Sequence, residues 1–215
     1  MRSPLRFLLA LALLPFYWVV SPISPAHAAT GDSDTYFNLE ANKTSSHSYA
    51  IMTNDSSVHF TSAFTFEMWL KPTDLCSSGY CHIFVKEEEY TLSIYNGTYQ
   101  LALKGTSDSW VWQDTTIKPQ INSWQHIAIT RAAGADAISM YLNGEVVYTA
   151  GAGGLSTLDF ATKTSSFQIG ARVGNYNSLN AAPDQSFIGS VDEVKLWQTA
   201  RTQSQVQSDM HTYGP

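Results

Sequence analysis

The segment from Phe64 to Pro72 reads FTFEMWLKP, and apolar residues occupy its alternate positions 64, 66, 68 and 70. Successive side chains of a strand point to opposite sides, so these four share one face of an extended chain. This period of two predicts a half-buried β-strand, which Pro72 ends.

A second alternating segment, residues 124–131, has Ile127 and Ile129 on one side. Asn143-Gly144 and Asn96-Gly97 each separate two β-rich runs, and Asn-Gly is a strong hairpin signal because both turn positions favour positive φ. Further strands are expected at residues 36–39, 49–52, 82–86, 110–112, 167–169 and 187–197. Roughly a dozen short strands with short turns predict an all-β, antiparallel sandwich.

One helix is expected near the end of the chain. Thr202 followed by Gln205 three residues later forms a capping box. Val206 and Met210, four residues apart, would lie on one face of this helix and dock on the sandwich.

The first 28 residues have the order of a secretory signal peptide. Arg2 and Arg6 precede an apolar run from residue 7 to 20, and Ala26-His27-Ala28 forms a small-residue cleavage pattern. Pro15 interrupts the run, which is shorter than the roughly 20 apolar residues of a membrane span. We therefore expect a signal peptide at 1–28, a single domain at 29–215, and a secreted, periplasmic or extracellular protein without a membrane span after cleavage.

The charge of the mature chain excludes some partners. The full chain has 12 Lys and Arg against 18 Asp and Glu. Cleavage would remove Arg2, Arg6 and no acid, which leaves ten basic against eighteen acidic residues. An acidic chain without a basic cluster argues against nucleic acid and against an anionic membrane surface.

Cys76 and Cys81 form a close pair. In an exported protein such a pair predicts a disulfide. His82 follows, but a zinc site needs about four ligands and no second cluster accompanies these residues. The disulfide would stiffen one loop.

Several of these segments together resemble the laminin-G-like and pentraxin-like domains of the concanavalin A-like lectin/glucanase superfamily. The resemblance covers about residues 36 to 211, and it rests on residues 64–72, 124–131, 141–144, 169–170, 187–197 and 199–202. It implies a jelly roll of two curved sheets, with ligand or calcium sites on the concave face or among the rim loops. It says little about function, because this fold carries many activities.

The candidate ligand-binding residues are aromatic and amide side chains. Trp110 and Trp112 would leave one face of a strand and stack on sugar rings; packing in the core is the alternative interpretation. Asn175, Tyr176 and Asn177 lie in a long polar loop, and such loops are often functional, although an ordinary surface loop is equally consistent.

Calcium is a further expectation that the resemblance implies. Asp192 matches a position near the metal in some relatives, and its alternative role is a hydrogen bond to a neighbouring loop or to Arg201. Calcium takes six to eight oxygen ligands, usually with several carboxylates.

The sequence gives little support for a catalytic function. A retaining glycosidase needs two carboxylates about 5 Å apart, and no strand carries the glucanase-type acidic pattern. The sequence therefore predicts a secreted, non-catalytic module for an extracellular glycan. The alternatives are a protein-interaction or adhesion module that binds a cell-surface protein, and a glycan hydrolase. A flat apolar patch would favour the former and two facing carboxylates the latter.

Overall fold

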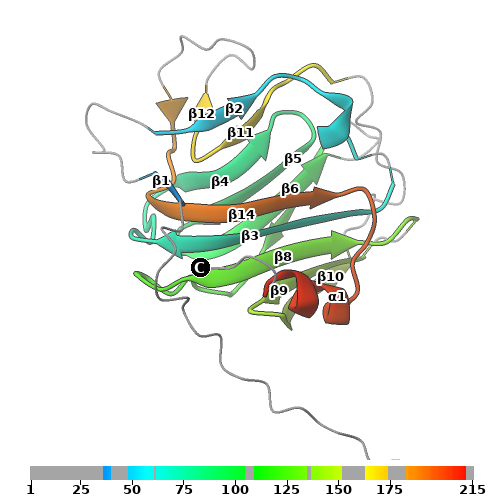
Figure 1. Cartoon of the computed structure of the whole chain (residues 1–215). Coiled ribbons are helices and arrows are strands. Elements are labelled where there is room, and N and C mark those ends of the chain that lie inside the picture. The colour runs from blue at the N-terminus through cyan, green and yellow to red at the C-terminus, as the bar shows by residue number, and fades with distance from the viewer. Residues whose placement is uncertain are drawn as a thin grey trace, which may run out of the picture.

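The computed structural model of the protein describes residues 36–39, 48–60, 62–104, 109–134, 137–151, 163–173 and 183–211. Two six-stranded antiparallel sheets pack face to face, as Figure 1 shows. The first sheet has the order β1 (Phe37–Asn38), β14 (Gly189–Trp197), β3 (Phe64–Pro72), β8 (Gln125–Arg131), β9 (Ala137–Leu142) and β10 (Glu145–Gly151).

The second sheet has the order β2 (Ala50–Met52), β11 (Phe167–Ile169), β4 (Tyr80–Lys86), β5 (Tyr90–Tyr95), β6 (Thr98–Lys104) and β7 (Trp110–Asp114). Two short strands, β12 (Arg172–Val173) and β13 (Pro183–Asp184), pair with each other, and a 3-10 turn, η1, spans Ser56–Val58. The predicted antiparallel sandwich is thus confirmed.

The core lies between the sheets and follows the predicted alternation. The apolar residues of β3 at positions 64, 66, 68 and 70 are all buried there, and Ile127 and Ile129 of β8 join them. Leu92 of β5, with Leu101 and Leu103 of β6, supplies the opposite layer. Because side chains alternate along each strand, the remaining residues of the second sheet point away from this core.

The helix α1 (Gln203–Asp209) closes the outer face of the first sheet. Its capping box is present as predicted. The Thr202 side chain accepts the backbone N–H of Gln205, and the Gln205 side chain accepts the backbone N–H of Thr202. Val206 is fully buried against Ala128 and Tyr141. Trp69 also points to this face, where its Nε1 donates to the backbone oxygen of Met210 at 3.2 Å. The helix therefore seals a side of the sandwich opposite to the second sheet.

Candidate functional site

A hollow of ≈ 210 Å³ lies on the outer face of the second sheet. Its lining combines aromatic rings with hydrogen-bonding groups from strands β4, β5 and β7 and from the segments around β12 and β13. The lining residues are Tyr80, His82, Val85, Glu87, Thr91, Trp110, Trp112, Arg172 and Gln185.

The register of the strands explains why the sheet is hollowed here. Val85, Thr91, Ala102 and Trp112 lie side by side across β4, β5, β6 and β7. Thr91 and Ala102 carry small side chains, and Ser93 occupies the next outward position of β5. Small residues in the middle of the sheet leave space between larger ones on β4 and β7.

Trp110 and Trp112 form the β7 wall, and their ring centroids are 5.8 Å apart. Val111, between them, packs against the core, so both indoles point outward. Trp112 is 42% exposed although it is a large apolar side chain. The structure thus places both tryptophans at the hollow and outside the core, while their binding role stays a prediction.

Tyr80 closes one end of the hollow. Its ring stacks on that of Tyr95 at 4.2 Å and lies 5.8 Å from His82 and 5.9 Å from Trp112. Burial raises the pKa of the Tyr80 hydroxyl, and the neighbouring Tyr95 and Asp114 raise it further. The phenol therefore stays neutral at physiological pH and presents both a ring face and a hydroxyl group.

His82 is held in the wall of the hollow by contacts on both ring nitrogens. Its Nδ1 lies 2.9 Å from Oγ1 of Thr91, and its Nε2 lies 2.9 Å from Oε1 of Gln185. The Thr91 hydroxyl also donates its proton to the Phe84 carbonyl at 3.1 Å, which fixes the position of its oxygen beside His82. These contacts fix the imidazole and orient the Gln185 amide beside it.

Glu87 and Arg172 form an ion pair at the edge of the hollow, in which Nε of Arg172 donates to Oε1 of Glu87. The side chain of Glu87 is 8% exposed, whereas that of Arg172 is 35% exposed. A nearly buried carboxylate is thus neutralised by a guanidinium that still reaches solvent. Such a pair offers both hydrogen-bond acceptors and donors.

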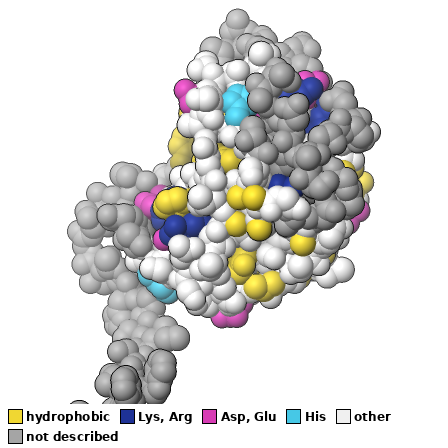
Figure 2. Space-filling model, turned by 90° about the vertical axis from the view of Figure 1, so that its right-hand side faces the viewer, with side chains coloured by type: hydrophobic (Ala, Val, Ile, Leu, Met, Phe, Trp, Pro, Cys, Tyr) yellow, Lys and Arg dark blue, Asp and Glu magenta, His cyan; other side chains and the backbone are white. Residues whose placement is uncertain are grey.

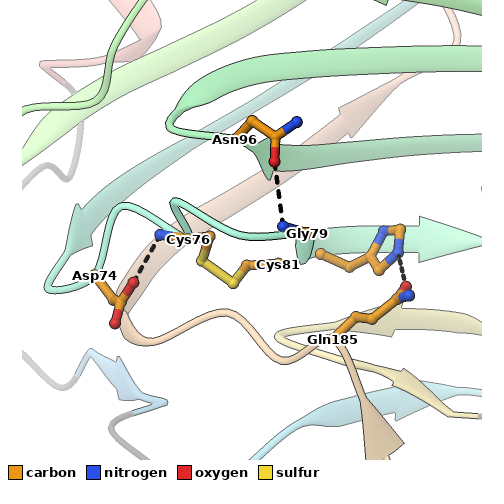
Figure 3. Close-up of a disulfide and its surroundings, with 7 residues drawn as sticks. Asp74, Cys76, Gly79, Cys81, Asn96 and Gln185 are labelled. Carbon is orange, nitrogen blue, oxygen red and sulfur yellow. Dashed lines mark hydrogen bonds between the residues drawn. A yellow bond between two sulfur atoms is a disulfide. The ribbon is translucent and has the colours of Figure 1, made fainter.

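The predicted disulfide between Cys76 and Cys81 is present, and the loop that it closes carries Tyr80. The backbone N–H of Cys76 donates to Oδ1 of Asp74 at 2.6 Å, and that of Gly79 donates to Oδ1 of Asn96 at 3.2 Å. Figure 3 shows these two bonds around the disulfide, with Gln185 near Cys81. The loop is therefore anchored directly beside the hollow.

The other predicted site residues are not brought to this hollow by the described part of the chain. Asn175, Tyr176 and Asn177 lie outside the described residues, as does the predicted signal peptide at 1–28. Asp192 pairs in register with Trp69 on the first sheet, and its Oδ1 accepts the backbone N–H of Glu193 at 2.8 Å.

The donor set near Asp192 does not by itself form a calcium site. Within the described ranges, no three His, Cys, Asp or Glu side chains gather as they would around a metal ion. Calcium prefers several carboxylates and further oxygens. A calcium role for Asp192 stays a prediction that would need ligands from elsewhere.

Sequence reasoning missed Tyr80, His82, Glu87, Arg172 and Gln185 as site residues. His82 and Gln185 are 103 residues apart in sequence, and nothing local marks them as neighbours. The available signal was the outward alternation of β4, where residues 80 and 82 fall on one face. It identifies a face but not the loops that fold over it.

Comparison with known protein families identifies the superfamily of this fold. Residues 43–207 match a laminin G family model described as the concanavalin A-like lectin/glucanases superfamily. The chain belongs to this superfamily. Membership agrees with the resemblance predicted from the sequence, and with the two-sheet architecture.

One curated relative of this superfamily member is the mouse (Mus musculus) sushi, von Willebrand factor type A, EGF and pentraxin domain-containing protein 1. It is 26% identical over 177 residues, which are 80% of this chain and 5% of the relative. The chain thus spans a small part of that relative's length.

Two solved structures are similar to this superfamily member. A Bacteroides ovatus protein provisionally named as a carbohydrate binding protein has a TM-score of 0.57 at 22% identity, over 74% of this chain and 43% of that one. A heptameric SAP-like pentraxin from Limulus polyphemus has a TM-score of 0.50 at 17% identity, over 74% and 79%. Identities this low support the fold alone. Among the described residues, no helix has the length and apolarity to cross a membrane.

Proposed function

We propose that the protein is a non-catalytic carbohydrate-binding module that acts outside the cell, and that the hollow on the second sheet is its glycan site. The observation that carries this proposal is the pair of outward-facing indoles, Trp110 and Trp112, beside a wall of fixed hydrogen-bonding groups. Sugar rings have apolar faces and polar edges, so they require this combination.

The chemistry of the walls fits a sugar lying between them. The half-exposed ring of Trp112 offers a flat apolar surface that a ligand would cover. Facing it, Gln185, the Tyr80 hydroxyl and the Glu87–Arg172 pair supply donors and acceptors for sugar hydroxyls. His82 and Gln185 already hold each other, so less side-chain entropy is lost on binding.

Binding without hydrolysis is favoured by the distribution of carboxylates. Of the described residues that line the hollow, Glu87 is the one with a carboxyl group, and it is engaged by Arg172. Glycoside hydrolysis requires two carboxyl groups across the scissile bond, one of which must be free to donate a proton. The lining in the described ranges supplies no such pair.

The comparisons support a binding role in a general way. The family description names lectins together with glucanases, and one structural neighbour is provisionally named as a carbohydrate binding protein. An extracellular location is supported by the Cys76–Cys81 disulfide, by the predicted signal peptide, and by a relative whose name includes a pentraxin domain.

A protein-interaction surface has less support from the described residues. Their exposed large apolar side chains belong to several different strands and loops: Tyr36, Phe37, Met52, Leu75, Trp112 and Val146. On the face shown in Figure 2, apolar side chains form small groups among uncharged atoms. The adhesion alternative requires a larger continuous patch.

Calcium, if bound at Asp192, would act away from the sugar. Asp192 belongs to β14 of the first sheet, whereas the hollow is built on the second sheet. We therefore propose that sugar contacts in the hollow are made by side chains without a bridging metal ion.

A glycan array probed with the purified protein tests this function. Specific binding is expected, with loss in Trp112→Ala and retention in Trp124→Ala, a tryptophan that contacts Tyr36 instead of the hollow. Addition of a calcium chelator is expected to leave binding unchanged. Absence of binding to every glycan would overturn the proposal, as would equal loss in both variants.

A further inference from the structure

The described lining of the hollow has no net charge. Glu87 and Arg172 neutralise each other. Two further charged residues on the same face are also engaged: Lys104 lies 3.8 Å from Glu88, and Asp114 accepts a hydrogen bond from Gln100. A ligand entering the hollow therefore meets ring faces, dipoles and a compensated ion pair, and the nearby Asp114 carboxylate, whose charge acts on Tyr80, would repel an anionic ligand.

The ion pair is arranged to disfavour an acidic sugar. A carboxylate or sulfate that bound Arg172 would compete with Glu87, whose side chain is only 8% exposed. Separating the pair would leave a nearly buried carboxylate without its cation, which is costly. Two neighbouring hydroxyl groups, by contrast, accept from the guanidinium and donate to the carboxylate while the pair stays intact.

The two tryptophans provide separate ring platforms along the hollow. Residues two apart on a strand are about 6.6 Å apart, and the indole centroids are 5.8 Å apart. Trp110 is in register with Lys104, and the backbone N–H of Lys104 donates to the Glu89 carbonyl. Trp110 therefore lies at the end of the hollow near the β4–β5 turn, which carries Glu87. Trp112 lies at the other end, next to Tyr80.

We propose that the ligand is an uncharged oligosaccharide that places consecutive rings on Trp110 and Trp112, with hydroxyl groups of the Trp110-bound ring engaging Glu87 and Arg172. This inference rests on the proposed glycan-binding function and narrows it. It excludes uronic acid and sulfated chains as ligands, and it requires at least two sugar rings for full affinity.

Isothermal titration of the purified protein tests the inference. The neutral probes are gluco-, manno- and xylo-oligosaccharides, each as the single sugar, the disaccharide and the tetrasaccharide. The charged probes are oligogalacturonides and heparin oligosaccharides of the same lengths. One neutral series is expected to bind about tenfold more tightly as a disaccharide than as a single sugar, with little dependence on salt.

Failure of this inference is distinguishable from failure of the proposed function. Tighter binding of galacturonides or heparin, weakened by salt, would overturn the neutral class and leave glycan binding standing. Equal affinity for the single sugar and the disaccharide would overturn the two-ring arrangement. Binding of none of the probes, together with a blank glycan array, would remove the proposed function itself.

Two variants of the ion pair sharpen the test. In Glu87→Gln, the carboxylate that competes with an anionic sugar for Arg172 is removed, so binding of galacturonides is expected to appear, and unchanged rejection would contradict the assigned role. In Arg172→Gln, the neutral chain is expected to weaken about tenfold while galacturonides stay unbound. Galacturonide binding by Arg172→Gln would equally overturn the inference. Trp110→Ala should reduce the affinity for the disaccharide to that for the single sugar.

Discussion

The rings of Tyr80 and Trp112 lie 5.9 Å apart, although β5 and β6 separate their strands β4 and β7 in the sheet. The two side chains approach each other on the outer face of the sheet, where Ser93 of β5 is in register with Gln100 of β6. They close one end of the hollow, which makes this end sensitive to changes on either strand.

Removal of the Trp112 indole is the simplest test of this arrangement. Trp112→Ala is expected to weaken glycan binding by about 1–2 kcal/mol, roughly five- to thirtyfold, because the stacking surface is lost. The side chain is 42% exposed, so the free energy of unfolding should change little. Titration of the variant and a denaturant unfolding curve measure the two effects. Trp124→Ala is the control, and equal weakening there would contradict the assignment.

The disulfide is expected to support both glycan binding and folding. In Cys76→Ser/Cys81→Ser the closed loop, whose cysteines are five residues apart, opens. Tyr80 then loses the tether beside it, and glycan affinity should fall several-fold. Loss of so short a loop constraint costs about 2 kcal/mol of unfolding free energy on the chain-entropy estimate.

Titration of the protein in the presence and absence of a thiol reductant, and of the double variant, measures this effect. Reductant should have no influence on the double variant. Undiminished affinity after reduction would show that the Asp74 and Asn96 hydrogen bonds hold the loop without the disulfide.

His126 should make the fold less stable in acid. Burial lowers the pKa of His126 from 6.5 to about 4, and Lys195 and His211 add to the shift. Because the unfolded chain binds this proton more readily, stability is present above about pH 6.5 and is lost as pH falls toward 4. The loss is on the order of 3 kcal/mol.

Denaturant unfolding across this pH window, with His126→Gln as the comparison, measures the contribution. The variant should show a shallower fall in stability. Burial raises the pKa of the neighbouring Glu67, whose contribution has the opposite sign and is lost as pH rises. Identical pH profiles for the two proteins would contradict the assignment to His126.

A buried ion pair under the second sheet gives a contrasting pH dependence. Nζ of Lys86 lies 2.7 Å from Oε1 of Glu89, and both side chains are fully buried. Burial raises the pKa of Glu89 to about 7. Lys86→Met should destabilise the fold by about 3–5 kcal/mol at a pH of about 8, because Glu89 then loses its main cation. The loss should be smaller at lower pH, where Glu89 is protonated.

The double variant Lys86→Met/Glu89→Gln is the control for this pair. It removes both charges, so it should recover much of the stability and most of the pH dependence should disappear. His59, 3.1 Å from Glu89, remains as a second partner and limits the recovery. A loss in Lys86→Met that does not vary with pH would contradict the coupling.

The fold was predictable from the sequence because its signals are local. The alternation at positions 64–70 identifies the core face of β3, and the Thr202 capping box locates α1. The Trp110 and Trp112 spacing predicted a shared face, which the structure bears out. The partners of this pair were not predictable, since strand order and register, rather than neighbouring residues, bring His82, Arg172 and Gln185 to them.

In the second sheet, the side chains that pack the core are different from those that shape the hollow. On β6, Leu101 and Leu103 face the core, whereas Ala102 between them lies on the outer side of the sheet, in register with Trp112. A substitution at position 102 would alter the depth available to a ligand and leave the inner layer untouched. Selection, or a protein engineer, can therefore change what this surface recognises without first rebuilding the sandwich that supports it.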